Sequence, residues 1–158
     1  MEIKENFWHK STKPLFMLAP MEDVTDTAFR ELVMRMSSAS KLHILFTEFT
    51  STDGLSHPLG RDKVNYRLHI SNSERQVLKS MGIKIIAQVW GNKPEKFSKA
   101  VAYISEEYDF DGIDINMGCP VKNVVAHGSG AALINSEGLA GEIIAATREA
   151  SKLPLSIK

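Results

Sequence analysis

Five short apolar runs alternate along this sequence with segments whose apolar residues recur at helical spacing, and this alternation restricts the fold more than any other feature. Apolar runs of this length, bounded by turn residues, are typical of buried strands. Strands that alternate with helices form a parallel sheet with right-handed connections. The sequence therefore predicts an α/β fold. The predicted strands are 15–19, 44–49, 83–90, 112–116 and 154–158.

The helical segments are identified by the spacing of their apolar residues. Asp23 or Thr25 is placed to cap the first helix, and Pro94 suits the first turn of a later one. Residues 50–71 are rich in polar and turn residues and are too long for a simple connection, so they predict a functional loop or a small insertion. The expected buried stripes are Phe29, Leu32, Val33 and Met36; Phe97, Ala100, Val101 and Ile104; and Leu139, Ile143, Ala146 and Ala150.

Two parallel architectures fit this order of elements, a doubly wound sheet and a (β/α)8 barrel. The turn after the first strand, residues 19–23, lacks the Gly-x-Gly-x-x-Gly pattern of a dinucleotide-binding sheet, which favours the barrel. A barrel normally needs about 250 residues, whereas this sequence has 158. We therefore expect a partial TIM barrel holding about the first five strands, with residues 1–158 as the N-terminal portion of a catalytic domain.

Charge and cysteine content exclude several classes of function. The 19 basic and 19 acidic residues balance, so the chain as a whole does not attract nucleic acid or an anionic membrane. Cys119 is the single cysteine, which excludes an internal disulfide and a cysteine-based zinc site. The five histidines show no paired ligand spacing, so we expect no metal. Without a signal peptide or a membrane-spanning run, the protein is expected to be cytoplasmic.

Polar residues stand where the predicted strands end. The carboxyl ends of parallel strands meet at one edge of a sheet, which is where ligands bind in both architectures. Any one of these residues could be a solvated side chain at the rim, but together they indicate a site. They are Pro20 with Met21, Glu48, Gln88 with Gly91, Asn116 with Cys119, and Lys158.

The segment after the fourth predicted strand combines a cysteine with a glycine-rich stretch. Cys119 lies directly past the strand end, where we expect it at the rim and not in the core. A thiol with the reference pKa of about 8.5 is mostly protonated at neutral pH, so it can donate a proton or act as a nucleophile. The stretch 128–132 lacks phosphate-loop spacing and predicts a tight turn packed against the next helix. Asp109 and Asp111 form an acidic cluster with Asp114, but these two lie opposite the active end.

Several motifs together give the chain a specific resemblance from residue 14 onward. The most specific is the Asn-Met-Gly-Cys-Pro element with the Gly-x-Gly-Ala that follows it. With these motifs the sequence resembles the tRNA-dihydrouridine synthase family. The matching segments are Leu18-Ala19-Pro20-Met21, Val24-Thr25-Asp26, Phe29-Arg30, Thr47-Glu48, Ala87-Gln88, Asp114 to Pro120, Gly128 to Leu133 and Ser156-Ile157-Lys158.

The resemblance implies an FMN-dependent TIM barrel that reduces the C5=C6 bond of a uridine in tRNA, with NADPH as the reductant. Carried over residue by residue, Pro20, Met21 and Glu22 would contact FMN. Gln88 would hydrogen-bond the edge of the isoalloxazine ring. Lys158 would place a positive charge where negative charge gathers on the reduced flavin.

For the substrate, the resemblance implies that hydride passes from flavin N5 to C6 of the uracil while Cys119 delivers a proton to C5. Asn116 would orient the base or the flavin, and Lys122 could hold an RNA phosphate, although a plain surface charge is the better interpretation of that lysine. Family members continue through further strands, which carry the FMN phosphate site, and a helical tRNA-binding domain. We therefore expect this chain alone to be poorly active and the full-length protein to be a monomer.

Three other interpretations stay open at this point. The chain could belong to another FMN barrel, such as a dihydroorotate dehydrogenase, whose site also sets an Asn and a Cys-Pro after a strand. It could be a non-catalytic half-barrel that binds RNA or a protein partner, or a lyase that uses Lys158 to form a Schiff base. The enzymatic interpretation depends on Gln88, Cys119 and Lys158 facing a common pocket around a flat redox ring.

Overall fold

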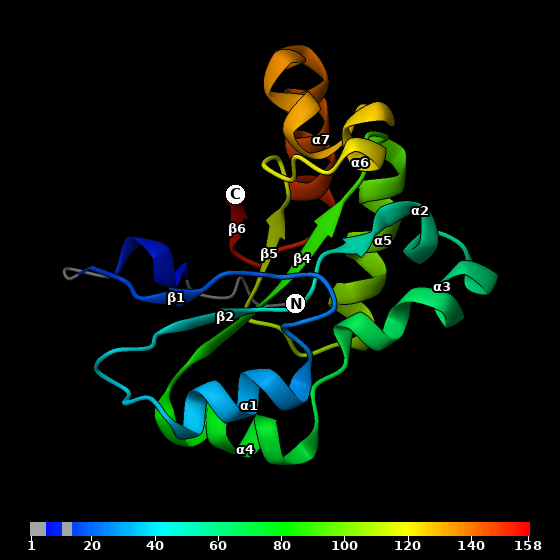
Figure 1. Ribbon diagram of the computed structural model, residues 1–158. Coiled ribbons are helices and arrows are strands. Elements are labelled where there is room, and N and C mark those ends of the chain that lie inside the picture. Colours follow the sequence, from blue (N-terminus) through cyan, green and yellow to red (C-terminus); the bar gives the residue numbers. More distant parts are fainter. Residues whose placement is uncertain (1–5, 11–13) are drawn as a thin grey trace.

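The computed structural model describes residues 6–10 and 14–158, which form one parallel sheet with helices packed around it (Figure 1). In the described residues the sheet has six strands in the order β1-β2-β4-β5-β6, with β3 paired to β4. Every strand pair is parallel. The spatial order follows the chain order, whereas a doubly wound sheet reverses its order at a switch point. The predicted α/β fold of partial TIM-barrel type is confirmed.

The elements have the following bounds. The strands are β1 Met17–Leu18, β2 Ile44–Phe46, β3 Thr50–Ser51, β4 Lys84–Trp90, β5 Gly112–Ile115 and β6 Leu155–Ile157. The α-helices are α1 Thr27–Arg35, α2 Thr52–Leu55, α3 Pro58–Val64, α4 Asn72–Met81, α5 Pro94–Glu107, α6 Lys122–Ala126 and α7 Glu137–Ala150. The 3-10 helices are η1 Phe7–His9, η2 Asn65–Leu68 and η3 Gly130–Asn135.

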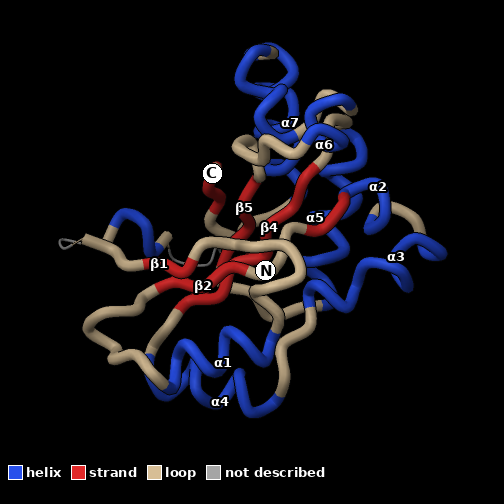
Figure 2. The backbone as a smooth tube through the Cα atoms, viewed as in Figure 1, coloured by secondary structure: helices blue, strands red, loops and turns tan. Residues whose placement is uncertain are grey.

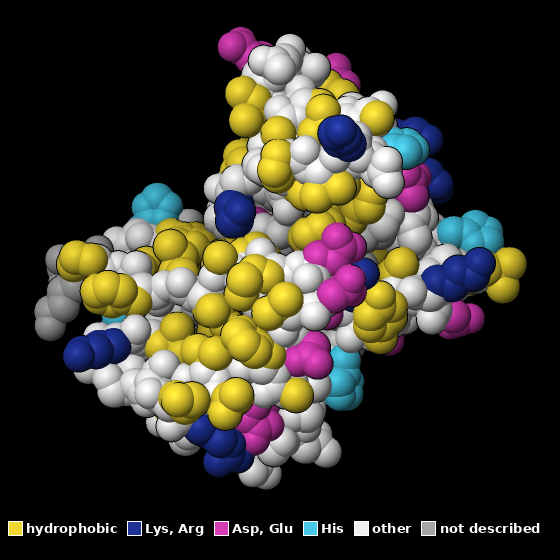
Figure 3. Space-filling view, viewed as in Figure 1, with side chains coloured by type: hydrophobic (Ala, Val, Ile, Leu, Met, Phe, Trp, Pro, Cys, Tyr) yellow, Lys and Arg dark blue, Asp and Glu magenta, His cyan; other side chains and the backbone are white. Residues whose placement is uncertain are grey.

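The longer helices pack against one another along the sheet, as Figure 2 shows with helices in blue and strands in red. Helix α1 contacts α4, and α5 contacts both α2 and α7. The strand face carrying Ile44, Phe46 and Ile86 is covered in part by Phe7 and Trp8 of η1. Hydrophobic side chains gather on the face of the molecule over β1 and β2 (Figure 3). Met17, which pairs in register with Ile44 and so lies on the same face, is 49% exposed, so the described residues cover this strand face only in part.

Helix α5 forms as its sequence predicts. Pro94 occupies the first turn, and the side chains of the predicted stripe, Phe97, Ala100, Val101 and Ile104, have 0% exposure. Burying a Phe, Val or Ile side chain stabilises a fold by about 1.5–3 kcal/mol. This stripe therefore fixes α5 on the sheet beside β4 and β5, the two strands that carry most of the polar residues described below.

Helix α1 forms where predicted but turns a different face inward. Its N-cap is Asp26, not Asp23 or Thr25. The buried side chains are Arg30 and Met34, whereas Leu32 and Met36 of the predicted stripe are 54% and 80% exposed. The predicted stripe is therefore wrong for Leu32 and Met36, whereas Val33 is partly buried against the core. The face that packs is selected by a buried ion pair between α1 and α4, which apolar periodicity does not reveal.

The segment expected to be a loop or insertion is mostly helical. Residues 50–71 contain β3, α2, α3 and η2. Pro58 stands in the first turn of α3, and the side chain of His57 accepts a hydrogen bond from the backbone N–H of Leu59. A Cβ on Gly60 would lie 2.4 Å from the backbone oxygen of Gly54, so glycine is needed at Gly60 for the close approach of α2 and α3. The turn-forming composition of residues 50–71 thus reflects tight packing between short helices.

Candidate functional site: a cleft at the carboxyl ends of the strands

A cleft of about 360 Å³ opens beside the carboxyl ends of β1 and β6. Its wall is largely apolar, and its polar groups include a carboxylate, a hydroxyl and a lysine. Two residues predicted to bind a cofactor, Pro20 and Lys158, line it. A third lining residue, Trp8, has an indole N–H that is buried without a hydrogen-bond partner. The lining residues are Trp8, Met17, Ala19, Pro20, Phe46, Asp114, Ser156, Ile157 and Lys158.

The loop between β1 and α1 is held in a defined shape by its own hydrogen bonds. The backbone N–H of Met21 donates to Oγ1 of Thr25 at 3.0 Å, and the backbone N–H of Thr25 donates to the carbonyl of Met21 at 3.0 Å. Asp23 adopts a left-handed conformation with φ of 56°, and its N–H donates to Oε1 of Glu48 at 2.6 Å. Glu48, predicted at a strand end, therefore stabilises this loop.

Glu22 and Glu48 both pair with one arginine. Arg67 of η2 lies 3.0 Å from Oε1 of Glu48, 3.1 Å from Oε1 of Glu22 and 3.3 Å from Oδ1 of Asp23. The Arg67 side chain is only 14% exposed. Its charge is thus balanced by neighbouring carboxylates, so Arg67 acts as a structural cation of this loop.

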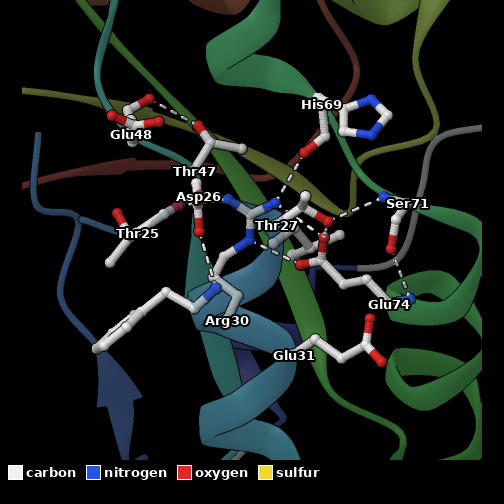
Figure 4. Close-up of polar contacts among 12 residues, drawn as sticks. Thr25, Asp26, Thr27, Arg30, Glu31, Thr47, Glu48, His69, Ser71 and Glu74 are labelled. Carbon is white, nitrogen blue, oxygen red and sulfur yellow. Dashed lines mark hydrogen bonds and ion pairs between the residues drawn. The ribbon is translucent and has the colours of Figure 1, made fainter. Parts of the chain in front are cut away.

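A second buried arginine holds the far end of the same loop (Figure 4). Arg30 and Glu74 both have 0% side-chain exposure and form a bidentate pair, with Nε at 2.7 Å from Oε1 and Nη2 at 2.9 Å from Oε2. The hydroxyl of Thr27 also donates to Glu74. The guanidinium further donates to the carbonyls of Thr25 and His69. The ion pair thus ties α1, α4 and the loop together.

Gln88 and Asn116 lie in a buried hydrogen-bond network that reaches the cleft. Nε2 of Gln88 donates to Oδ2 of Asp114 at 2.6 Å, and Nδ2 of Asn116 donates to Oε1 of Gln88 at 3.0 Å. Oδ1 of Asn116 accepts from the backbone N–H groups of Gly118 and Cys119 at 3.1 and 3.0 Å. Gln88 itself has 0% exposure and does not line the cleft. Asp114 is the member of this network that lines it.

Asp114 is a site residue that the sequence analysis missed, because it was grouped with Asp109 and Asp111. Its carboxylate also accepts from Oγ of Ser156 at 2.6 Å. Burial raises the pKa of the Asp114 carboxyl, while the hydrogen bonds from Ser156 and Gln88 and the charge of Lys158 act in the opposite direction. A buried carboxylate aimed at an apolar cleft beside a lysine is a frequent mark of a functional site.

Cys119 lies in a different environment from the one expected. Its side chain is buried, with 9% exposure, in a cluster with Phe49 and Val124 against which Trp90 packs. The expectation of a thiol at the rim and outside the core is therefore wrong, because the loop folds back over these apolar side chains. Neither Cys119 nor Gln88 lines the cleft that holds Lys158, so this cleft alone does not bring the three residues together.

The glycine-rich stretch packs against the cysteine loop. The backbone N–H of Ala131 donates to the carbonyl of Cys119 at 3.0 Å. Gly130 has φ of 59°, and a Cβ there would lie 2.7 Å from the carbonyl oxygen of Cys119 and 2.8 Å from a methyl of Val124. The tight turn is confirmed, and its close contact is with the segment holding Cys119 in addition to the helix that follows.

The two predicted lysines have different positions. Lys158 is exposed and lines the cleft, and its backbone pairs with β5 through hydrogen bonds to Ile115 and Met117. Lys122 is exposed at the first residue of α6 and does not line the cleft. Within residues 6–10 and 14–158 no group of three acidic, histidine or cysteine side chains could hold a metal ion, and no helix has the length and apolarity to cross a membrane.

Comparison with known proteins adds the decisive observation. Residues 17–158, which include every strand and every α-helix described above, match the model of the family described as dihydrouridine synthase (Dus). The chain belongs to the dihydrouridine synthase family. The family match extends across the cleft residues from Met17 onward and across the segment that holds Cys119.

Individual relatives agree with this family. The chain is 44% identical over 154 residues to "Probable tRNA-dihydrouridine synthase 2" of Bacillus subtilis (strain 168), covering 98% of the chain and 43% of that protein. It is 44% identical over 156 residues to "Probable tRNA-dihydrouridine synthase" of Staphylococcus aureus (strain COL), covering 99% of the chain and 44% of that protein. The chain thus spans less than half the length of these curated relatives.

Proposed function

We propose that the protein to which this chain belongs reduces uridine to 5,6-dihydrouridine in cytoplasmic tRNA, with FMN as cofactor and NADPH as reductant. Residues 1–158 would form the N-terminal part of an FMN-binding TIM-barrel catalytic domain, which acts as a monomer. The single observation that carries this proposal is the cleft beside the ends of β1 and β6 in a chain of the dihydrouridine synthase family. Binding at the carboxyl ends of barrel strands is the rule for enzymes of this architecture.

The residues around the cleft fit a flavin. Its wall is apolar over most of its lining, as a flat aromatic ring requires, and Lys158 supplies a cation for a ring that becomes negatively charged on reduction. Pro20, Met21 and Lys158 would hold FMN directly. Glu22 and Gln88 would contribute through the groups they contact, Arg67 and Asp114. When bound, FMN supplies the hydride chemistry that no side chain of the protein can provide.

The chain's own residues would control the substrate and its proton. Cys119 would deliver the proton of its thiol to C5 of the uracil, where negative charge develops during reduction. Asn116 would orient the part of the site that faces the uracil, because its side-chain carbonyl accepts a hydrogen bond from the backbone N–H of Cys119. The buried position of the thiol keeps bulk water away from that proton.

The RNA must present an unstacked base to such a site. A uridine in a tRNA stem or loop reaches a buried pocket only when it leaves its stack, which requires extrusion or an unpaired segment. Lys122 is exposed at the start of α6, close in sequence to Cys119, and would contact a neighbouring phosphate. The balanced net charge of the chain means that such local contacts, and not bulk attraction, would hold the RNA.

The test is a count of dihydrouridine in tRNA. Mass spectrometry of tRNA from cells with the intact gene, from cells without it, and from cells complemented with a Cys119→Ala form measures the modification at each position. We expect dihydrouridine to disappear from at least one position in the deletion strain and to stay absent with Cys119→Ala. Unchanged dihydrouridine at every position of the deletion strain would refute the substrate assignment.

A further inference from the structure

Three neighbouring strands place polar side chains side by side in one row. The strand register pairs Gln88 of β4 with Asp114 of β5, and Asp114 with Ser156 of β6. Side chains in register on adjacent strands point to the same face of the sheet. The hydrogen bonds run along this row from Ser156 through Asp114 to Gln88, and then to Asn116 and the loop that carries Cys119.

We propose that Asp114 is a positioning residue whose carboxylate fixes the orientation of the Gln88 and Asn116 amides, and through them the position of the loop that carries Cys119. The inference rests on the proposed function for its consequence in catalysis. Its structural part depends only on the hydrogen bonds of the described residues. No other group in the row lines the cleft and also contacts Gln88.

The orientation of the row follows from the fixed roles of donors and acceptors. An ionised carboxylate only accepts hydrogen bonds, and a backbone N–H only donates. Asp114 therefore requires the NH2 end of Gln88, which turns the Gln88 carbonyl toward Asn116. Asn116 must then present its own NH2 to Gln88, which leaves its carbonyl facing the N–H groups of Gly118 and Cys119. Both ends of the row demand the same orientation.

The opposite orientation is excluded by burial. If the two amides were flipped, the Gln88 carbonyl would face the Asp114 carboxylate and the Asn116 NH2 would face the loop N–H groups. Gln88, Asp114 and Asn116 have exposures of 0%, 1% and 3%, so these groups cannot turn to water instead. Buried polar groups without partners are strongly unfavourable, so the row acts as one unit.

Because Asp114 lines the cleft, the row also connects the cofactor side of the site to the cysteine side. Lys158 lies on the same cleft and its charge acts on Asp114. Cys119 does not line the cleft. Its backbone N–H donates a hydrogen bond to Oδ1 of Asn116, at the far end of the row. Hydrogen bonds thus join the loop of Cys119 to the cleft, although Cys119 does not line it.

The test reverses the hydrogen-bond orientation of the row with one substitution and restores its complete pairing with a second. Asn116→Asp puts a carboxylate where the loop N–H groups still find an acceptor, but it faces the Gln88 carbonyl, so Gln88 must flip and turn that carbonyl toward Asp114. Adding Asp114→Asn supplies an NH2 group for the flipped Gln88 and leaves a carbonyl for Ser156. Every group in the double variant has a partner again, in the reverse orientation. Asp114→Asn alone can keep the original orientation, because the Ser156 hydroxyl can accept a hydrogen bond from the new NH2 group.

The first readout is the rate at which iodoacetamide alkylates Cys119 in the intact protein, followed by mass spectrometry of the peptide that holds this residue. Loss of one hydrogen bond between the side chains of the row should loosen the loop and raise this rate about tenfold for Asn116→Asp, and the double variant should return close to the wild-type rate. If Asn116→Asp alone does not fold, recovery of folded protein on adding Asp114→Asn supports the proposal in the same way. A double variant at least as reactive, or as poorly folded, as Asn116→Asp contradicts it.

A matched control and a second readout separate this inference from the proposed function. Thr147→Val removes a buried hydrogen bond to the carbonyl of Ile143 in α7 and should leave the alkylation rate unchanged. Dihydrouridine formation by the intact protein should fall with Asn116→Asp and recover in the double variant. Rescue of the alkylation rate without dihydrouridine in any form, wild type included, would refute the function only. Dihydrouridine in the wild type without rescue in the double variant would refute the positioning role only.

Discussion

The buried pair of Arg30 and Glu74 allows a quantitative test of how this half-barrel is held together. The substitution Glu74→Gln keeps the shape of the side chain and an acceptor oxygen but removes the negative charge. Both side chains have 0% exposure, so the Arg30 guanidinium would remain buried with no counter-charge. Its other acceptors, the carbonyls of Thr25 and His69, carry only partial charges.

The expected loss of stability follows from this burial. Removing one partner of a buried ion pair destabilises a protein by about 3–5 kcal/mol, since a single charge is left away from water. For a domain of this size, each kcal/mol lowers the melting temperature by about 2–4 °C, so Glu74→Gln should lower it by about 6–20 °C. The difference should persist at about 1 M salt, where the Debye length of about 3 Å screens exposed charges but not a buried pair.

Urea unfolding followed by circular dichroism measures this difference, at low and at high salt. The matched control is Glu31→Gln on α1, the helix that carries Arg30, because Glu31 pairs with Arg35, whose side chain is 59% exposed. Its midpoint should shift far less, and any shift should vanish at high salt. A Glu74→Gln midpoint equal to that of Glu31→Gln would refute the conclusion that the pair selects the buried face of α1.

Three further predictions concern the site. Gly130→Ala should destabilise the chain by at least about 1–2 kcal/mol in urea unfolding, because L-residues are strained at positive φ, whereas Gly138→Ala, with open space around its Cβ, should not. Cys119→Ala should leave flavin absorbance of the intact protein unchanged but slow dihydrouridine formation by about 10²–10⁴-fold, and an unchanged rate would exclude it as the acid. Folding raises the pKa of Asp114. The stability of the wild type relative to Asp114→Asn should therefore fall as pH rises above the unfolded pKa of about 3.9, and should level off above the raised pKa. Urea midpoints of the wild type and Asp114→Asn that change in parallel with pH would contradict this.

Much of the fold was predictable because its signals are local. The strand β4 and the stripe of α5 follow from apolar runs and from Pro94, and both formed as expected. The prediction of the buried face of α1 failed because the fully buried Arg30 defines that face, and its partner Glu74 lies 44 residues away in the sequence. The helices within residues 50–71 were missed because a segment whose glycines let two helices approach closely has the same composition as a glycine-containing loop.

The site was predictable in its location but not in its connections. Pro20 and Lys158 reached one cleft because parallel strands end at the same edge of the sheet. Gln88 and Cys119 stood at the correct ends of their strands, yet they are buried behind that edge. Whether a strand-end side chain turns into the cleft or away from it depends on strand register and on loop packing. The length of the connections between parallel strands predicts neither the strand register nor the packing of the loops.

A signal for Asp114 was nevertheless present in the sequence. Aspartate is depleted in strands, and an unpaired carboxylate between Ile113 and Ile115 would be strongly unfavourable in a buried strand. Such a residue requires partners from the adjacent strands. Strand β6 has one polar residue, Ser156, and β4 has one polar residue away from its first position, Gln88. The requirement that each buried polar residue be paired would therefore have given the row and its register together, before any coordinates were known.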